Sequence, residues 1–272
     1  FITSPLISVL FSEMLSVWTV AFWQNLKCPK NINLIELGAG NGQMMYDMIN
    51  SFKSFPEFNK SCKFYIFETS PHLKKIQKEK LKRFNVIWIK NLNEIKKNYN
   101  IFIANEFFDA LPIKQFFKIN KKWMERFVAL KKNNKKKFIN FDSNIKKVEK
   151  KIGFKISKNQ KIIEYSPLGL EYLKIISKKI NKTKGGLLII DYGYLENSMK
   201  DTLMAIKKHN NSNVLNAFGN SDITHKLNFN IFKKFTKNLK LKCQGITTQK
   251  KFLTTLGINQ RAEILSKNLP FS

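Results

Sequence analysis

Cysteine and histidine are scarce in this 272-residue sequence, with three of each. The cysteines lie far apart with no paired spacing, which excludes a cysteine zinc site and favours a reducing compartment. The histidines likewise form no ligand cluster, so we expect no metal site. The six residues are Cys28, Cys62, Cys243, His72, His209 and His225.

Arginine is also rare, because only three of the 49 basic residues are arginine, although the formal net charge is +30. Such an excess usually indicates a nucleic-acid or anionic-membrane partner. Proteins that recognise nucleic acids rely on arginine for bidentate contacts to phosphate and guanine, however. The abundance of lysine, asparagine, isoleucine and phenylalanine favours a bias toward AT-rich codons instead. No nucleic-acid partner is therefore predicted.

Apolar runs long enough to span a membrane are missing as well. The run from Leu15 to Trp23 is too short for a span and is bounded by Glu13 and Gln24. We expect it to form a core helix. A chain of this length can bury one substantial core, and we expect residues 1–272 to form a single domain.

A glycine-rich loop follows the apolar segment that begins at Leu34 in LIELGAGNG. Gly38, Gly40 and Gly42 are spaced two apart and precede a helix expected from about Gln43, an arrangement that lets a ligand approach the backbone closely. A dinucleotide fingerprint would place its third glycine one residue later. Glu36 suits a ligand with a cationic amine, so the pattern favours S-adenosylmethionine over a nicotinamide or flavin. A purely structural glycine turn remains an alternative.

The next predicted strand lies in the segment CKFYIFETS, residues 62–70, which is apolar up to Phe67 and then has Glu68 at the end of the strand. In a doubly wound sheet this carboxylate would accept hydrogen bonds from the ribose hydroxyls. The alternative is a surface glutamate after a strand. Ser70 and Pro71 predict the start of a helix. Its expected buried face contains Leu73, Ile76, Leu81 and Phe84.

Strands and helices continue to alternate, which predicts an α/β fold with a mostly parallel, doubly wound sheet. Further strands are expected at 85–89, within 98–112, and within 185–194. The fourth strand is followed by Asn105, Glu106 and Asp109, and the fifth by Asp191 and Tyr192. Ligands and chemistry gather at the carboxyl edge of such sheets, so we expect these residues near the site. Glu106 and Asp109 could instead cap the loop and a following helix.

An antiparallel insertion is predicted between strands four and five, at about 115–160. Residues 115–142 alternate apolar and polar positions, which indicates two or three strands. A helix is expected over 164–180, a polar and poorly periodic stretch from 191 to about 222, and a helix over 228–239. The region 245–265 predicts a strand-like start, a break at Gly257 and a C-terminal helix.

Ordered blocks along the whole chain resemble the MidA/DUF185 family of S-adenosylmethionine-dependent methyltransferases. The most specific blocks are ANEFFDALP and DYGY. Others are FITSPLISVLFSEMLSVW, ELGAGNG, ETSPHL, EYSPLGLEYL, DTLMAIKKH, SDITHKLNF, TTQKKFL and LGINQRAEIL. The chain departs from the family pattern at Leu6, Ala39, Asn41, Lys200 and Met204, and the region specific to the family spans about 195–230. The family has a further stretch before the first block, so we expect an N-terminally truncated chain.

The resemblance implies a Rossmann-like class I methyltransferase, since the family includes a mitochondrial complex I assembly factor that methylates protein arginine. It implies S-adenosyl-L-methionine as cofactor, a protein substrate such as a complex I subunit, and a location in a bacterial cytoplasm or the mitochondrial matrix. In this scheme Glu106, with Asp109 as second acid, holds the guanidinium and accepts its proton, and Asn105 orients their loop and contributes to cofactor binding. Thr224 and His225 belong to a further family block, and His225 is interpreted as structural and kept out of the catalytic residues. Alternatives are an RNA or small-molecule methyltransferase, or an assembly chaperone that binds the cofactor without turnover.

Overall fold

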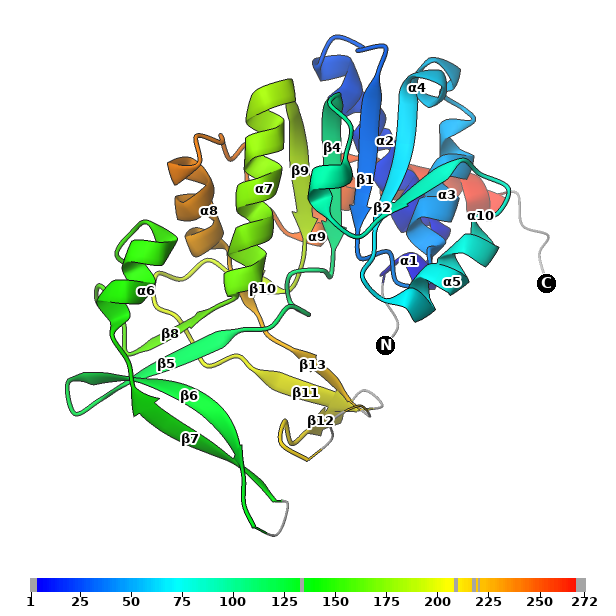
Figure 1. Ribbon diagram of the computed structural model, residues 1–272. Helices are drawn as coiled ribbons and strands as arrows, with labels where there is room; N and C mark the ends of the chain where they lie inside the picture. The colour runs from blue at the N-terminus through cyan, green and yellow to red at the C-terminus, as the bar shows by residue number, and fades with distance from the viewer. Residues whose placement is uncertain (1–3, 133–134, 208–209, 217–218, 220, 268–272) are drawn as a thin grey trace. The chain divides into compact units, whose positions relative to one another are not determined.

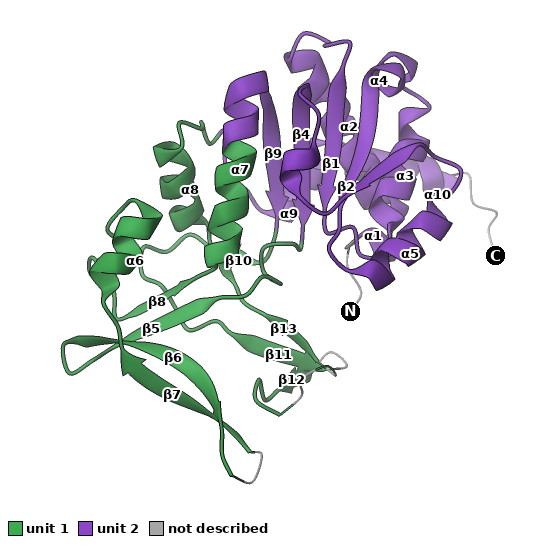
Figure 2. Ribbon diagram, viewed as in Figure 1, with its two compact units in different colours: residues 1, 106–177, 191–243 green, residues 2–105, 178–190, 244–272 purple. Residues whose placement is uncertain are grey.

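The computed structural model describes residues 4–132, 135–207, 210–216, 219 and 221–267. Figure 2 divides the chain into two compact units. Unit 1 contains residues 106–177 and 191–243 together with residue 1, and unit 2 contains residues 2–105, 178–190 and 244–272. The Phe1–Thr3 part of the first family block and His209 lie outside the described residues. The expectation of a single domain stays a prediction.

Unit 2 is built on a five-stranded parallel sheet with the order β3-β2-β1-β4-β9 (Figure 1). Its strands are β1 (Ile32–Leu37), β2 (Cys62–Phe67), β3 (Val86–Ile89), β4 (Tyr99–Asn105) and β9 (Gly185–Ile190). All six residues of β1 are buried, as expected for a central strand covered on both faces. The predicted α/β fold class is confirmed, and the five predicted strands are present.

The core helix, the helix after the glycine loop, the helix from Ser70 and the C-terminal helix of unit 2 were predicted, and its other helices were not. The described helices of the unit are α1 (Ser4–Ile7), α2 (Val9–Asn25), α3 (Gln43–Phe52), α4 (Pro56–Ser61), α5 (Pro71–Lys80), the 3-10 helix η1 (Leu92–Glu94), α9 (Gln249–Thr255) and α10 (Ile258–Lys267). Leu15, Met45 and Phe52 from α2 and α3 pack with Leu34 and Ile101 of the sheet in one buried cluster. The run from Leu15 to Trp23 is therefore part of a core helix, as predicted.

Two predictions about unit 2 are wrong in detail. Ile76 is 38% exposed, whereas Gln77 is fully buried. Leu73, Gln77, Leu81 and Phe84 are spaced three or four residues apart, which is the spacing of one helical face. The buried residue between Leu73 and Leu81 is therefore Gln77, and Ile76 points away from this face. The expected strand-like start near residue 245 is also wrong, because residues 241–248 have no regular secondary structure and lead into α9.

Unit 1 contains an antiparallel sheet with the order β7-β6-β5-β8. The strands are β5 (Lys114–Ile119), β6 (Lys122–Leu130), β7 (Lys136–Asp142) and β8 (Ile162–Tyr165). The first three confirm the antiparallel insertion. β8 was not predicted, and it pairs with β5. Gln115 on β5 donates from Nε2 to Glu164 on β8 over 2.6 Å.

The rest of unit 1 consists of helices and short strands. The helices are α6 (Ile145–Ile152), α8 (Phe229–Asn238) and α7 (Pro167–Thr183), whose last residues belong to unit 2. The stretch after Asp191 forms β10 (Gly193–Tyr194), β11 (Met204–Lys207), β12 (Asn210–Ser212), β13 (Asp222–Thr224) and β14 (Leu227–Asn228). The helices over 164–180 and 228–239 were predicted, whereas these short strands were not.

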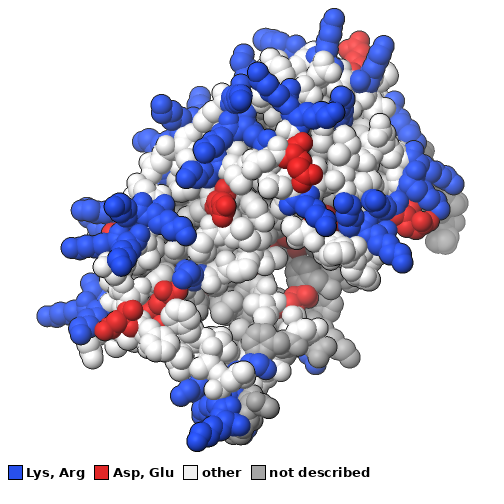
Figure 3. Space-filling view, in the orientation of Figure 1, with Lys and Arg blue, Asp and Glu red and all other residues white. Residues whose placement is uncertain are grey.

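The basic side chains on the face drawn in Figure 3 are spread over many elements and do not form one stripe. The described lysines of the two runs in the insertion are exposed, namely Lys131, Lys132, Lys135, Lys136, Lys137, Lys146, Lys147, Lys150 and Lys151. They form solvated surfaces. None of the helices in the described part of the chain combines the length and the apolar character that crossing a bilayer requires.

Candidate functional site

The glycine loop of unit 2 joins β1 to α3. Gly38, Gly40 and Gly42 have φ angles of 68°, 52° and 82°, in the region that favours glycine. A Cβ added at Gly40 would have no heavy atom within 4 Å. The space in front of Gly40 is therefore open, so the loop can take a ligand that lies close to the backbone. The loop begins with a hydrogen bond of 3.0 Å from the Gly38 N–H to the Phe67 carbonyl.

Glu36, near the end of β1, is a buried carboxylate with a strongly perturbed pKa. Its side chain is 4% exposed, and Oε2 has no hydrogen-bond partner among the described residues. Its pKa is raised to about 8, first by burial and then by the charge of Glu68, while a hydrogen bond from the Met45 backbone lowers it. A cationic group beside Glu36 would favour the ionised form and supply a partner for Oε2. These properties fit the amine expected from the sequence.

Glu68 follows β2 directly, as predicted, and is 6% exposed. Its Oε1 accepts a hydrogen bond from the Ser70 N–H over 2.8 Å, and its Oε2 accepts one from Gln77 Nε2 over 2.9 Å. Each carboxylate oxygen has two lone pairs, so both retain capacity for a ligand hydroxyl. The alternative of a surface glutamate is wrong, because this carboxylate is buried and hydrogen-bonded.

Gln77 was not singled out from the sequence, although it contacts both predicted binding segments. Its Nε2 donates to the Gly40 carbonyl over 2.8 Å and to Glu68, and its Oε1 accepts from the Trp88 indole over 3.0 Å. The available signal was a glutamine on the apolar face of α5, where an uncharged amide must find partners when buried.

Asn105 is the last residue of β4 and pairs with Ile190, the last residue of β9. Its Oδ1 is buried and has no hydrogen-bond partner among the described residues. Along the chain, Glu106 follows Asn105 directly and Asp191 follows Ile190. The two acids thus come one residue after paired positions of neighbouring strands, as the sequence indicated.

Glu106 begins the loop segment of unit 1. It is half-buried and has a φ angle of 47°. A left-handed backbone is uncommon for a residue other than glycine and is enriched at functional sites. The alternative that Asp109 caps a following helix is wrong, because residues 110–113 form turns and irregular structure that lead into β5.

Asp109, which is buried, and Asp191, which is half-buried, form an acid pair in unit 1. The Phe108 and Asp109 N–H groups donate to Asp191 Oδ2 over 3.0 and 3.3 Å. The pKa of Asp191 is raised to about 8, first by burial and then by the charge of Asp109, while hydrogen bonds from backbone N–H groups lower it. Like charges this close disfavour simultaneous ionisation, so the pair suits a cationic ligand.

Thr224 and His225 also contact Asp109, a grouping that the sequence did not predict. Thr224 Oγ1 donates to Asp109 Oδ2 over 2.7 Å, and the His225 N–H donates to the Asp109 carbonyl over 3.2 Å. His225 is 5% exposed, and burial lowers its pKa. Asp109 Oδ1 is buried without a hydrogen-bond partner among the described residues. One oxygen of Asp109 is therefore held and the other is available.

Tyr192, next to Asp191, is 55% exposed. Burial raises its pKa first, and the charges of Glu106, Asp109 and Asp191 raise it further. The tyrosine thus reports a negative potential produced by all three acids. An exposed aromatic ring beside buried acids suits the entrance for a cationic substrate.

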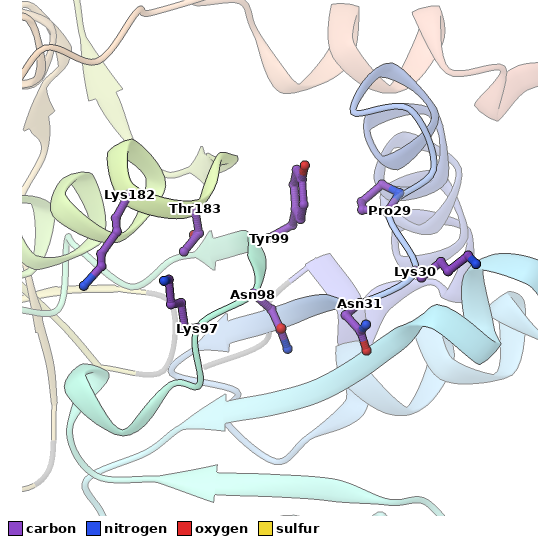
Figure 4. A pocket seen from close by; sticks show the side chains of 8 residues that line it. All are labelled: Pro29, Lys30, Asn31, Lys97, Asn98, Tyr99, Lys182 and Thr183. Carbon is purple, nitrogen blue, oxygen red and sulfur yellow. The ribbon is translucent and has the colours of Figure 1, made fainter.

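One cavity of unit 2 lies away from the glycine loop. A cavity of about 590 Å³ in unit 2 lies at the amino ends of β1 and β4, lined by Lys30, Asn31, Asn98 and Tyr99 among others (Figure 4). The glycine loop is at the carboxyl end of β1, so this cavity is separate from it. Within the described ranges, no group of three histidine, cysteine or acidic residues could hold a metal ion.

Known proteins are similar to nearly the whole chain. The family model described as "Putative S-adenosyl-L-methionine-dependent methyltransferase" matches residues 14–247. Protein arginine methyltransferase NDUFAF7, mitochondrial, from Xenopus laevis is 30% identical, with 97% of this chain and 66% of the relative covered. The Homo sapiens protein of the same name is 28% identical, with 97% and 65% covered. The chain spans about two thirds of the length of these relatives.

A solved structure agrees with the fold. It is a COG1565 superfamily member from Burkholderia thailandensis, bound to S-adenosyl-homocysteine, with a TM-score of 0.79 at 20% sequence identity. The match covers 97% of this chain and 69% of the Burkholderia chain. The family match confirms the resemblance and the cofactor expected from the glycine loop. Because that match extends over residues 14–247, the chain belongs to this family of S-adenosyl-L-methionine-dependent methyltransferases.

Proposed function

We propose that this methyltransferase modifies arginine side chains of a protein. The observation that carries the proposal is the acid pair of unit 1, in which Asp191 accepts hydrogen bonds from the Phe108 and Asp109 N–H groups and has its pKa raised to about 8, first by burial and then by the charge of Asp109. A guanidinium is permanently charged and can bind carboxylates bidentately, so it suits two neighbouring acids. The relatives named as protein arginine methyltransferases support this acceptor.

The proposed cofactor residues are Glu36, Gly38, Gly40, Gly42, Glu68 and Asn105. Glu36 would bind the amine of the methionyl group through Oε2, and the loop around Gly40 would lie against the ligand. Glu68 would accept the ribose hydroxyls, with its carboxylate already held by Ser70 and Gln77. Bound S-adenosylmethionine supplies an electrophilic methyl group on a sulfonium. Asn105, with its available Oδ1, would orient the loop and contact the same ligand.

The proposed catalytic residues are Glu106 and Asp109. They hold the guanidinium, concentrate its positive charge on the nitrogens away from the methyl donor, and so make the remaining nitrogen a better nucleophile. As the new C–N bond forms and the S–CH3 bond breaks, that nitrogen loses a proton. Glu106 accepts it, and Asp109 Oδ1 stabilises the cationic product. Thr224 keeps Asp109 Oδ2 oriented through its hydroxyl.

The protein partner is proposed to be a subunit of respiratory complex I. The support comes from the family resemblance. The relatives are named as mitochondrial proteins, which supports the mitochondrial matrix over a bacterial cytoplasm as the place of action. The acids around Tyr192 would favour a basic segment of this partner.

Labelled S-adenosylmethionine tests the proposal when it is incubated with the protein and cell lysate, with and without nuclease. We expect nuclease-resistant label in a protein band and methylarginine after acid hydrolysis of that band. Label that nuclease removes would identify an RNA methyltransferase, and label only in the small-molecule fraction would identify a metabolite acceptor. A protein that binds the cofactor but transfers no label would be an assembly chaperone. Each of the last three results overturns the proposal.

A further inference from the structure

Gln77 is a fully buried polar side chain in the middle of α5. Burying an amide is unfavourable unless its donors and acceptor are satisfied. The Gln77 amide meets this requirement with three partners from three separate segments: Gly40 in the glycine loop, Glu68 after β2, and Trp88 on β3. A single side chain therefore links the two segments of the proposed cofactor site, the glycine loop and the residues after β2, to the neighbouring strand β3.

The orientation of this amide is set by Trp88. An indole N–H can only donate, so it must face the amide oxygen of Gln77, at 3.0 Å. The Nε2 group then faces the other way, and its two hydrogens point to the Gly40 carbonyl and to Glu68 Oε2, at 2.8 and 2.9 Å. A flipped amide would place Nε2 against the indole donor and Oε1 against two acceptors, which is unfavourable at all three contacts.

These contacts fix the relative positions of two proposed ligand-binding groups, the glycine loop and Glu68. Gly40 has a φ angle of 52° and open space in front of it, and its carbonyl is held by Gln77 Nε2 over 2.8 Å. Glu68 is held at Oε1 by the Ser70 N–H and at Oε2 by Gln77. Gln77 thereby couples the position of the loop to the orientation of the acid.

We propose that Gln77, oriented by Trp88, is a positioning residue that holds the glycine loop and Glu68 at the spacing required by the adenosyl part of S-adenosylmethionine. The inference rests on the proposed cofactor site. Gln77 and Trp88 act through Gly40 and Glu68 without bonding the ligand themselves. They reduce the conformational freedom that the loop and the acid would otherwise lose on binding.

The competing interpretation is that Gln77 only satisfies buried polar groups and so contributes to stability alone. The two interpretations differ in what Trp88 does. If Trp88 acts through Gln77, removing the indole N–H weakens cofactor binding. The same removal has no further effect in a variant that already lacks the Gln77 amide. If the contacts are only structural, the variants lower the melting temperature and leave cofactor affinity unchanged in the folded protein.

Calorimetric titration of the full chain with S-adenosylmethionine tests the proposal on Gln77→Leu, Trp88→Phe and the double variant. We expect affinity losses of about 10-fold for Gln77→Leu and about 3-fold to 10-fold for Trp88→Phe, in the range for one or two hydrogen bonds. The double variant should lose no more affinity than Gln77→Leu alone, because the two side chains act in series. Trp88→Phe keeps an aromatic side chain on β3, so it tests the proposal by itself if Gln77→Leu fails to fold.

Trp23→Phe is the matched control, because the Trp23 indole donates to the Pro29 carbonyl over 3.0 Å at the opposite end of β1. It should lower the melting temperature without changing affinity. Unchanged affinity in folded Gln77→Leu and Trp88→Phe, or additive losses in the double variant, would overturn the proposal. Glu68→Ala, titrated in parallel, separates this failure from failure of the site: normal binding by Glu68→Ala would mean that the cofactor site itself is wrongly placed.

Discussion

Glu68 in unit 2 and Asp109 in unit 1 are both buried carboxylates, yet different parts of the chain hold them. The donors to Glu68 are Ser70 and Gln77, two and nine residues away in sequence. The donor to Asp109 is Thr224, 115 residues away. The proposed cofactor site is thus assembled locally, whereas the acid cluster depends on distant segments of its unit. Substitutions in unit 2 should change cofactor affinity, and those in unit 1 should change turnover.

The largest effect is expected for Gly40→Val. A valine side chain would enter the open space in front of the loop and would also be strained at a φ angle of 52°. We expect S-adenosylmethionine affinity to fall by about 100-fold or more, equivalent to ~2.7 kcal/mol. Calorimetry on the folded variant provides the measurement.

Gly153→Val separates strain from ligand exclusion. Gly153 also has a positive φ angle, 90°, and open space, but it ends α6 in unit 1. This control should lose a similar amount of stability and bind the cofactor normally. Equal affinities for the two valine variants would remove the glycine loop from the cofactor site.

The next effect is expected for Glu68→Ala, which removes the acceptor of the ribose hydroxyls. Cofactor affinity should fall by about 1–3 kcal/mol, the range for hydrogen bonds to a charged group. Glu94→Ala is the control, because Glu94 accepts bonds from the Lys90 and Asn91 N–H groups at η1. It should reduce stability only. Titration of both variants checks the result, and a comparable loss of affinity in Glu94→Ala would argue against a ribose contact.

A further effect is expected in the pH dependence of stability. The pKa of Asp191 is raised to about 8 in the folded protein, from an ordinary value of 3.8. The protonated carboxyl therefore favours the folded state below pH 4, and this contribution is lost as the pH rises to about 8. Asp191→Asn cannot ionise, so its melting temperature should fall less than that of the unmodified protein between pH 5 and 9, by about 2–4 °C for each kcal/mol. If the melting temperatures of the two proteins fell equally over this pH range, Asp191 would have an ordinary pKa.

The sequence predicted unit 2 well because strand, loop and helix signals lie close together there. The glycines after β1 and the acid after β2 are local features of a parallel sheet, and both were located before the fold was known. Gln77 was missed because a glutamine on an apolar face resembles a surface residue. The strand expected near residue 245 was wrong because β-branched residues form a strand only when a partner strand is present.

Unit 1 was less predictable for a physical reason. The strands β10 to β14 contain two to four residues each, too few to show an alternating pattern. The contacts of Thr224 and His225 with Asp109 join segments 115 or more residues apart, and no local preference encodes such pairs. The sequence therefore identified Glu106 and Asp109 as candidate acids but could not show what surrounds them.

The most direct test of the account is Glu106→Gln, measured on one preparation for methyl transfer, cofactor affinity and thermal stability. Glutamine keeps the size of the side chain but cannot accept the proton or localise the guanidinium charge. Turnover should therefore fall by about 100-fold or more, while affinity and melting temperature barely change. A stable variant with near-normal turnover would contradict the assignment of methyl-transfer chemistry to Glu106.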